Sequence, residues 1–191
     1  PPSVPMFVPA ALWKSVWWLL LHHTELDLSA TFSAMTGGNI YLKYENSQKT
    51  GSFKIRGASN KIAALVERGE TGAVVASSAG NHAQGVAYAA HRFGIPATIV
   101  MPKTAPIAKA KATEGYGATV VLAGDCYDDA YAKACEICEQ EHATFLHPYN
   151  DPEVIAGQGT LGLEILGDLP TADIVIVPAG GGGLLAGVAA C

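Results

Sequence analysis

Charged residues are scarce in this sequence of 191 residues and make up 15% of it, against about 25% in typical soluble domains. The 12 basic residues form no cluster that would suit a nucleic-acid backbone, and the formal net charge is −5. We therefore expect no nucleic-acid partner. Hydrophobic residues make up 49% of the chain. This apolar surface has to be covered by a partner subunit or by a further segment of protein, and we expect a homo-oligomer.

Cysteine is also scarce, with four residues at positions 126, 135, 138 and 191. This density does not indicate a secreted disulfide scaffold. Cys135 and Cys138 lie three residues apart in a segment with a helical pattern. Because there is no second cysteine pair, we interpret them as packed apolar residues rather than as a redox pair, and we predict no metal site.

The apolar segment near the N-terminus is too short to cross a membrane. The uncharged run from Ser15 to Leu21 falls far short of the roughly 20 residues that a span needs. Lys14 interrupts the apolar stretch, and no small-residue cleavage site follows it, which argues against a signal peptide. We expect a cytoplasmic protein without a membrane partner, and we interpret residues 10–21 as a buried or partner-facing helix.

From Asn39 onward, short apolar runs alternate with helical patterns. The expected strands cover residues 40–44, 73–76, 97–101, 118–122, 144–146 and 174–177. The expected helices cover residues 52–68, 81–93, 106–114, 127–142 and 154–166, and a last helix begins at Leu184. This order predicts an α/β fold in which helices cover both faces of a mainly parallel sheet. Ligands bind such sheets at the carboxyl ends of the strands.

Four consecutive glycines, Gly180 to Gly183, follow the last expected strand and precede the helix at Leu184. Residues without side chains leave successive backbone N–H groups free to point at one anion, so a phosphate fits there. The same letters also satisfy the dinucleotide pattern G-x-G-x-x-A. An ordinary tight turn from strand to helix is the alternative interpretation.

Lys54 lies in the first turn of an expected helix, where the helix dipole disfavours a positive charge. Its neighbours Phe53 and Ile55 are apolar. Desolvation lowers the pKa of a lysine and frees the amine for Schiff-base chemistry. A solvated surface lysine is the alternative.

The loop from Ser77 to Gln84 follows an expected buried strand and offers hydroxyl, amide and backbone N–H groups where a helix starts. It would suit a carboxylate or another polar ligand group. Ordinary helix capping by Ser78 or Asn81 explains the same residues.

Taken together, residues 52–58, 78–85 and 180–183 occur in the order found in a known family. They resemble the fold-type-II pyridoxal-phosphate (PLP) enzymes, which are similar to the tryptophan synthase β subunit, and within them the threonine/serine dehydratases. The stretch from Asp151 to Thr160 extends the resemblance, which runs from about Ile40 to the end of the chain. Upstream of Thr24 the sequence does not resemble the family.

The resemblance implies a role for each residue of these motifs. Lys54 would bind PLP covalently and later take the Cα proton, and Phe53 would lie against the pyridine ring. Asn81 would bond the 3′-oxygen, and the cofactor phosphate would lie on the backbone of Gly180, Gly181, Gly182, Gly183 and Leu184. The pocket for the substrate carboxylate would be lined by Ser78, Ala79, Gly80 and His82.

The activity implied by the resemblance is α,β-elimination of L-threonine or L-serine, which gives 2-ketobutyrate or pyruvate and ammonia. Serine racemase is the alternative within the fold, although a serine takes the place of Ala79 in similar racemases. A dinucleotide-binding Rossmann domain and a non-catalytic fragment are the alternatives outside it. The expected organisation is a first part of a large domain (1–70, of which 1–23 is atypical), a small domain (71–150) and the start of the second part of the large domain (151–191), truncated at the C-terminus.

Overall fold

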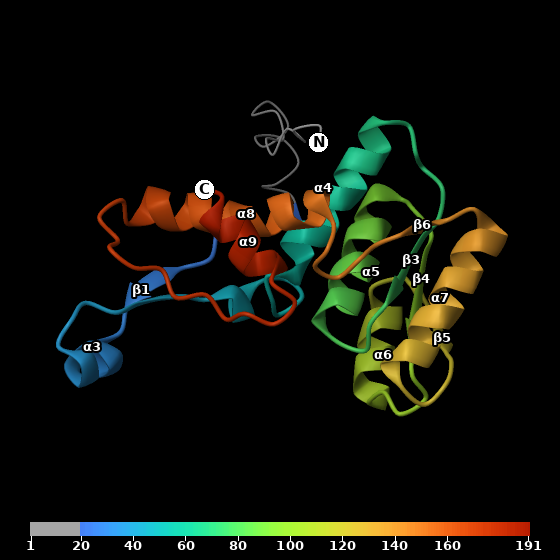
Figure 1. Ribbon diagram of the computed structural model, residues 1–191, viewed down its shortest axis with the longest axis horizontal. Coiled ribbons are helices and arrows are strands. Elements are labelled where there is room, and N and C mark those ends of the chain that lie inside the picture. The colour runs from blue at the N-terminus through green and yellow to red at the C-terminus, as the bar shows by residue number, and fades with distance from the viewer. Residues whose placement is uncertain (1–19) are drawn as a thin grey trace.

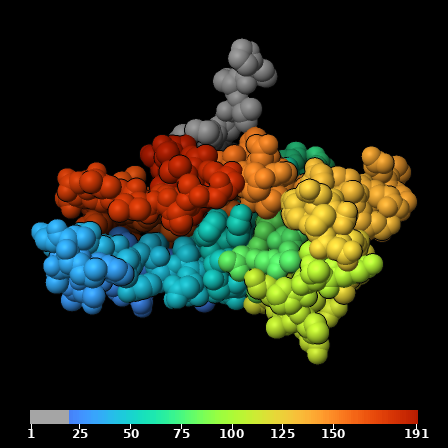
Figure 2. Space-filling model, turned by 60° about the horizontal axis from the view of Figure 1, so that its bottom comes forward, coloured from blue at the N-terminus to red at the C-terminus, as the bar shows by residue number. Residues whose placement is uncertain are grey.

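The computed structural model describes residues 20–191 and has an α/β architecture. One end of the molecule holds a parallel sheet with its helices. The other end holds the N-terminal strands and three helices, which are α4 (Lys54–Glu67), α8 (Pro152–Asp168) and α9 (Gly183–Ala189) (Figure 1). In Figure 2 the blue-to-cyan N-terminal part lies alongside the red C-terminal part. The helix expected over residues 10–21 lies outside the described residues except for Leu20 and Leu21, which are buried against Ile55.

The sheet consists of β3 (Val74–Ser77), β4 (Ala97–Met101), β5 (Thr119–Leu122) and β6 (Thr144–Phe145), in the order β5-β4-β3-β6. All three pairings are parallel. The chain starts in the middle with β3, adds β4 and β5 on one side, and then crosses to place β6 on the other side. The carboxyl ends of β3 and β6 therefore flank a topological switch point, where sheets of this kind bind ligands.

Helices cover both faces of this sheet, as the sequence predicts. Helix α5 (Asn81–Phe93) and helix α6 (Ile107–Gly115) pack on one face, in the apolar cluster that includes Ile99 and Met101. Helix α7 (Tyr127–Glu141) packs on the other face, against Val75 and Val100. Neighbouring residues of a strand point to opposite faces, so a strand covered on both sides has to be apolar throughout.

Glycines let the remaining helices approach one another closely. Helix α4 (Lys54–Glu67) crosses α8 (Pro152–Asp168), and a Cβ atom at Gly157 would lie 2.6 Å from the Arg56 carbonyl oxygen. Helix α9 (Gly183–Ala189) lies on α8, where a Cβ atom at Gly159 would lie 2.8 Å from the Gly187 carbonyl oxygen. Helix α8 is thus held between the turn that carries Lys54 and the segment that carries the glycines.

The N-terminal part contains elements that the sequence did not predict. Strand β1 (Leu26–Leu28) pairs antiparallel with β2 (Tyr41–Lys43), which confirms only the expected strand at 40–44. Between them lies α3 (Ala30–Thr36), which has no buried residue. A short 3-10 helix, η1 (Glu45–Ser47), follows β2. No helix within residues 20–191 has both the length and the apolarity to cross a membrane.

The strand predicted over residues 174–177 is wrong, because the structure has no strand there. Ile174 is 80% exposed and Ile176 is 88% exposed. A strand needs a hydrogen-bonded neighbour, and within residues 20–191 no strand pairs with this segment. An apolar run favours a strand by its composition, but composition does not supply a partner strand.

Candidate active site

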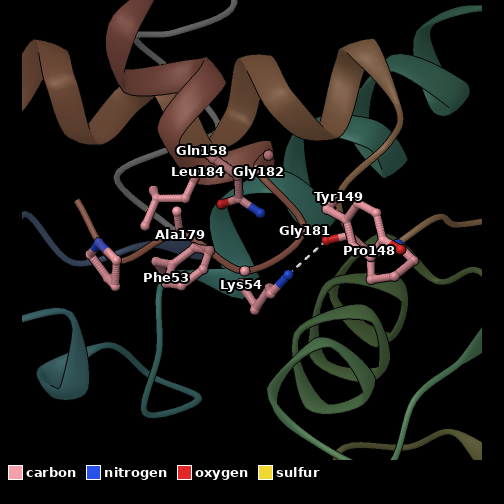
Figure 3. A pocket seen from close by; sticks show the side chains of 12 residues that line it. Phe53, Lys54, Pro148, Tyr149, Gln158, Ala179, Gly181, Gly182 and Leu184 are labelled. Atoms are coloured by element: carbon pink, nitrogen blue, oxygen red, sulfur yellow. Dashed lines mark hydrogen bonds between the residues drawn. The ribbon is translucent and has the colours of Figure 1, made fainter.

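A cavity of about 320 Å³ opens between the start of α4, the end of the sheet and the glycine segment (Figure 3). This volume lies in the range of small-molecule sites, about 300–1,000 Å³. The lining residues come from both ends of the chain and are Phe53, Lys54, Pro148, Tyr149, Gln158, Pro178, Ala179, Gly180, Gly181, Gly182, Gly183 and Leu184. The cavity thus brings together seven residues that the sequence analysis placed around a cofactor.

Lys54 is the first residue of α4, and its side chain is half-buried in the wall of the cavity. Its Nζ donates a hydrogen bond of 2.7 Å to the Pro148 carbonyl oxygen, just after β6 (Figure 3). Nζ also lies 5.3 Å from the centre of the Phe53 ring. Burial lowers the pKa of Lys54 below its usual value, because desolvation disfavours the charged amine. A larger fraction of uncharged, nucleophilic amine follows.

A buried ion-pair cluster anchors the turn that carries Lys54. The Arg56 guanidinium is fully buried and donates to Glu45 of η1 at 2.7 and 2.8 Å. It also donates to Glu164 of α8, at 2.6 and 3.0 Å. Arg56, two residues after Lys54, therefore ties both η1 and the distant helix α8 to the start of α4.

The glycine segment has a shape that side chains would prevent. Gly182 adopts a φ of 84°, which is a left-handed conformation that favours glycine. A Cβ atom at Gly181 would lie 2.4 Å from Cγ of Tyr149, and one at Gly183 would lie 2.7 Å from the Tyr149 carbonyl oxygen. The backbone therefore lies directly on Tyr149, with no room for a methyl group.

Hydrogen-bond donors outnumber acceptors in the side chains that line this cavity. None of the lining residues is acidic, whereas Lys54 and Gln158 both carry donors. Gln158 is 1% exposed, and its Oε1 accepts a hydrogen bond of 3.2 Å from the Gly57 backbone N–H. Its Nε2 is buried and has no hydrogen-bond partner among the described residues. The buried Nε2 is thus a donor without an acceptor, and the backbone of residues 180–183 forms a cradle that excludes Cβ atoms. Both features fit a bound group that carries a negative charge.

The loop after β3 lies beside this cavity but is not among the residues that line it. Ser78, Ala79 and Gly80 form the turn, in which the Gly80 N–H donates to Ser78 Oγ at 3.2 Å. Asn81 begins α5 and is exposed. Further along α5, a Cβ atom at Gly85 would lie 3.1 Å from the Ile55 backbone nitrogen. The helix that follows the loop therefore packs directly on the turn that carries Lys54.

His82 is 3% exposed and makes its contact with the protein rather than with solvent. Its Nε2 lies 3.0 Å from the Leu146 carbonyl oxygen, and because a carbonyl can only accept, Nε2 carries the hydrogen. Nδ1 is buried without a partner among the described residues. Burial lowers the pKa of His82 to about 4. The neutral ring joins the start of α5 to the end of β6.

Sequence reasoning missed several lining residues, namely Pro148, Tyr149, Gln158, Pro178 and Ala179. Tyr149 follows the expected strand at 144–146, at the edge of the sheet where ligands bind. That position was the available signal for it. Gln158 lies within the stretch 151–160 that carries the resemblance, but no local pattern marks it as a wall of the cavity. Within residues 20–191 no group of three or more His, Cys, Asp or Glu side chains is arranged to hold a metal ion.

Comparison with known proteins connects this geometry to sequence relatives. An L-threonine ammonia-lyase from Thermotoga maritima is 60% identical over 169 residues, which cover 88% of this chain and 42% of the relative. A catabolic L-threonine dehydratase from Escherichia coli is 54% identical, over 88% of this chain and 51% of the relative. The chain thus spans about half the length of the curated relatives that it matches.

Solved structures of similar enzymes match the fold of this chain as well. Threonine deaminase isoform 2 from Solanum lycopersicum matches with a TM-score of 0.85 and 43% identity, over 90% of this chain and 47% of that structure. Maize serine racemase matches with a TM-score of 0.86 and 41% identity, over 90% and 52%. The family model described as "Pyridoxal-phosphate dependent enzyme" matches residues 18–191. The chain therefore belongs to the family of pyridoxal-phosphate dependent enzymes.

Proposed function

We propose that this chain provides the lysine side of the active site of a threonine or serine ammonia-lyase. The reaction would convert L-threonine or L-serine to 2-ketobutyrate or pyruvate and ammonia. The observation that carries the proposal is the half-buried Lys54 amine, which lies in one cavity with a glycine cradle and no acidic side chain. The names of the two sequence relatives support the reaction class, and the family favours PLP over a dinucleotide.

The residues around the cavity divide into three groups with different roles. Lys54 would hold the cofactor covalently, Phe53 would lie against its ring, and Asn81 would bond its 3′-oxygen. The backbone N–H groups of residues 180–184 would hold the phosphate. The substrate carboxylate would lie at the loop after β3, which is formed by Ser78, Ala79, Gly80 and His82.

The side chains of this chain would serve the elimination by positioning and by proton transfer. PLP, when bound, supplies an electron sink for the charge that develops at the substrate Cα. Lys54 Nζ would take the Cα proton, and burial, which lowers its pKa, favours the uncharged amine that this step needs. The Pro148 carbonyl, which accepts from Nζ at 2.7 Å, would hold the amine when it is free.

The assembly and setting of the protein follow from the same proposal. We expect a cytoplasmic homo-oligomer that acts on a small amino acid, with residues 1–70 and 151–191 in a large domain and residues 71–150 in a small one. The sheet of β3 to β6 lies wholly within residues 71–150, which supports this division.

A product assay tests the proposed reaction. The unsubstituted chain, called the parent from here on, should release 2-ketobutyrate from L-threonine when PLP is supplied. Lys54→Ala should lower the rate about 10²–10⁴-fold, because it removes the general base. Lys111→Ala, on an exposed lysine of α6, is the matched control and should leave the rate unchanged. Equal rates in Lys54→Ala and the parent would contradict the mechanism, and absence of any product in the parent would favour the non-catalytic alternative.

Serine racemase remains the second candidate activity, because the fold of the maize enzyme is shared. Racemisation needs a second acid or base on the cofactor face opposite Lys54, and the methyl group of Ala79 cannot deliver a proton. Chiral analysis of the product from L-serine separates the two activities. We expect pyruvate in large excess over D-serine, and equal rates of the two would favour the racemase.

A further inference from the structure

Gln158 is the one buried side chain of the cavity wall whose role none of the motifs explains. It belongs to α8, while the other lining residues belong to the start of α4, the end of the sheet and the glycine segment. In Figure 3 its amide group lies in the middle of the pocket, between Leu184 on one side and Tyr149 on the other. A polar side chain that is 1% exposed normally has all its hydrogen-bonding atoms satisfied.

The oxygen and the nitrogen of this amide differ in their hydrogen bonds. Oε1 accepts the N–H of Gly57, at 3.2 Å. Gly57 lies in the first turn of α4, three residues after Lys54. Because a backbone N–H can only donate, the atom that faces it has to be the oxygen, and this fixes the orientation of the amide. The Nε2 group is then left with two hydrogens and no acceptor among the described residues.

An anion on the glycine cradle would satisfy this donor. The residues that line the cavity provide no carboxylate that could accept from Nε2. The amine of Lys54 also lies in the wall, but it already donates to the Pro148 carbonyl oxygen. A phosphate brings several acceptor oxygens, and a hydrogen bond to a charged acceptor is about twice as strong as a neutral one.

We propose that Gln158 is a further anion-binding residue of this site, which donates from Nε2 to the phosphate of the bound cofactor while its Oε1 holds the turn that carries Lys54. The inference rests on the proposed function. It links the two anchor points of the cofactor through one side chain, because the same amide contacts the Lys54 turn and lines the same cavity as the glycines.

The test compares two probes, PLP and pyridoxal, the second of which lacks the phosphate. The variant is Gln158→Glu, which keeps an acceptor for the Gly57 N–H but replaces the donor with a negative charge. Gln140→Glu makes the same change on the exposed surface of α7 and is the matched control. Dissociation constants are measured from the absorbance of the lysine-bound cofactor, and circular dichroism checks that each variant is folded.

We expect Gln158→Glu to weaken PLP binding about tenfold or more, as the loss of a bond to a charged group implies. Pyridoxal binding should change less than about threefold, and Gln140→Glu should bind both probes as the parent does. Unchanged PLP binding in Gln158→Glu would overturn the inference. So would an equal loss for both probes, which would show that Gln158 only supports the fold or contacts another part of the ligand.

The outcome for the parent chain is read separately. If the parent binds PLP at Lys54 and only the Gln158 result fails, the proposed function stands and this inference falls. If the parent binds neither probe, the proposed function and the inference fall together. Gln158→Met adds a further check, because it also removes the acceptor for the Gly57 N–H. We expect it to weaken both probes, and pyridoxal affinity equal to that of the parent would contradict the role of Oε1.

Discussion

Most of the surroundings of the His82 imidazole oppose its protonation, and one group favours it. Burial is the largest cause of its lowered pKa of about 4, the Leu146 carbonyl opposes that shift, and Lys54 and His147 add to it. The sequence analysis placed His82 in a substrate pocket. The structure shows that its ring joins α5 to the end of β6, and its contact with a substrate stays a prediction.

This environment predicts an acid-sensitive fold. Between pH 6.5 and pH 4 the unfolded state binds a proton at this histidine and the folded state does not, so the free energy of unfolding falls as the pH falls through that window. With a folded pKa of about 4, the loss attributable to His82 is about 3 kcal/mol. Urea unfolding of the parent and of His82→Gln at pH 7 and pH 4 measures it. His82→Gln keeps a donor for the Leu146 carbonyl. Between pH 7 and pH 4 its free energy of unfolding should fall by about 3 kcal/mol less than that of the parent. Identical losses would contradict the attribution of this acid sensitivity to His82.

The residues at the site differ in how far the sequence could identify them. Lys54 and the glycines were recognisable because each needs an unusual residue at a fixed place in a motif. Tyr149 and Gln158 are ordinary residues for a loop and a helix, and they become part of the wall only because β6 and α8 are brought to Lys54 by contacts far apart in sequence. No local pattern encodes such a juxtaposition.

At the scale of elements, the crossing of α4 and α8 depends on two glycines. A Cβ atom at Gly57 would lie 2.4 Å from Gln158 Nε2, and one at Gly157 would lie 2.6 Å from the Arg56 carbonyl oxygen. The second contact involves backbone that belongs to a helix and cannot move alone. The separation of these helices sets the distance between Lys54 and the wall formed by Gln158.

We therefore expect Gly157→Ala to destabilise the fold by about 1–3 kcal/mol through overpacking. Gly167→Ala is the matched control, because it lies in the same helix and its Cβ atom would meet nothing within 4 Å. It should be neutral or stabilise the fold by up to about 1 kcal/mol, since alanine is the better helix former. Thermal or urea unfolding of both variants compares them. A Gly157→Ala variant as stable as Gly167→Ala would show that the helices separate at no cost.

Most of the element boundaries were predictable because the signals are local. Helix α5 begins at Asn81 and ends at Phe93 as expected, with Gly94 in a left-handed conformation after it. Strand β4 also has the expected bounds. The segment at 174–177 failed for the opposite reason, because strand formation depends on a neighbour. Helix α3 was missed since it buries no side chain and so leaves no apolar periodicity in the sequence.

At the scale of the whole molecule, one group of exposed apolar side chains lies around α8, α9 and the segment before the glycines. Ile174, Val175 and Ile176 are exposed together with Leu166 and Leu185. Exposed apolar patches of this kind mark surfaces that associate with other protein. Other exposed apolar side chains, among them Phe32, Met35 and Ile107, lie elsewhere on the molecule.

This region predicts self-association of the 191-residue chain. Replacing Ile174 and Ile176 with lysine should shift the chain toward the monomer in sedimentation, because charge replaces exposed apolar surface while no buried contact is lost. Ile107→Lys, at an isoleucine of α6 that is 73% exposed, is the control and should leave the association unchanged. A parent chain that is monomeric at all concentrations would contradict this prediction.

The most direct test of the account is to locate the cofactor on the chain. The parent is incubated with PLP, reduced with borohydride and digested, and the peptides are mapped by mass spectrometry. Lys54 is the lysine whose amine faces the cavity, and burial lowers its pKa, so it should carry the phosphopyridoxyl group. The same label on Lys43 or Lys61, with Lys54 unmodified, would contradict the assignment of the active site.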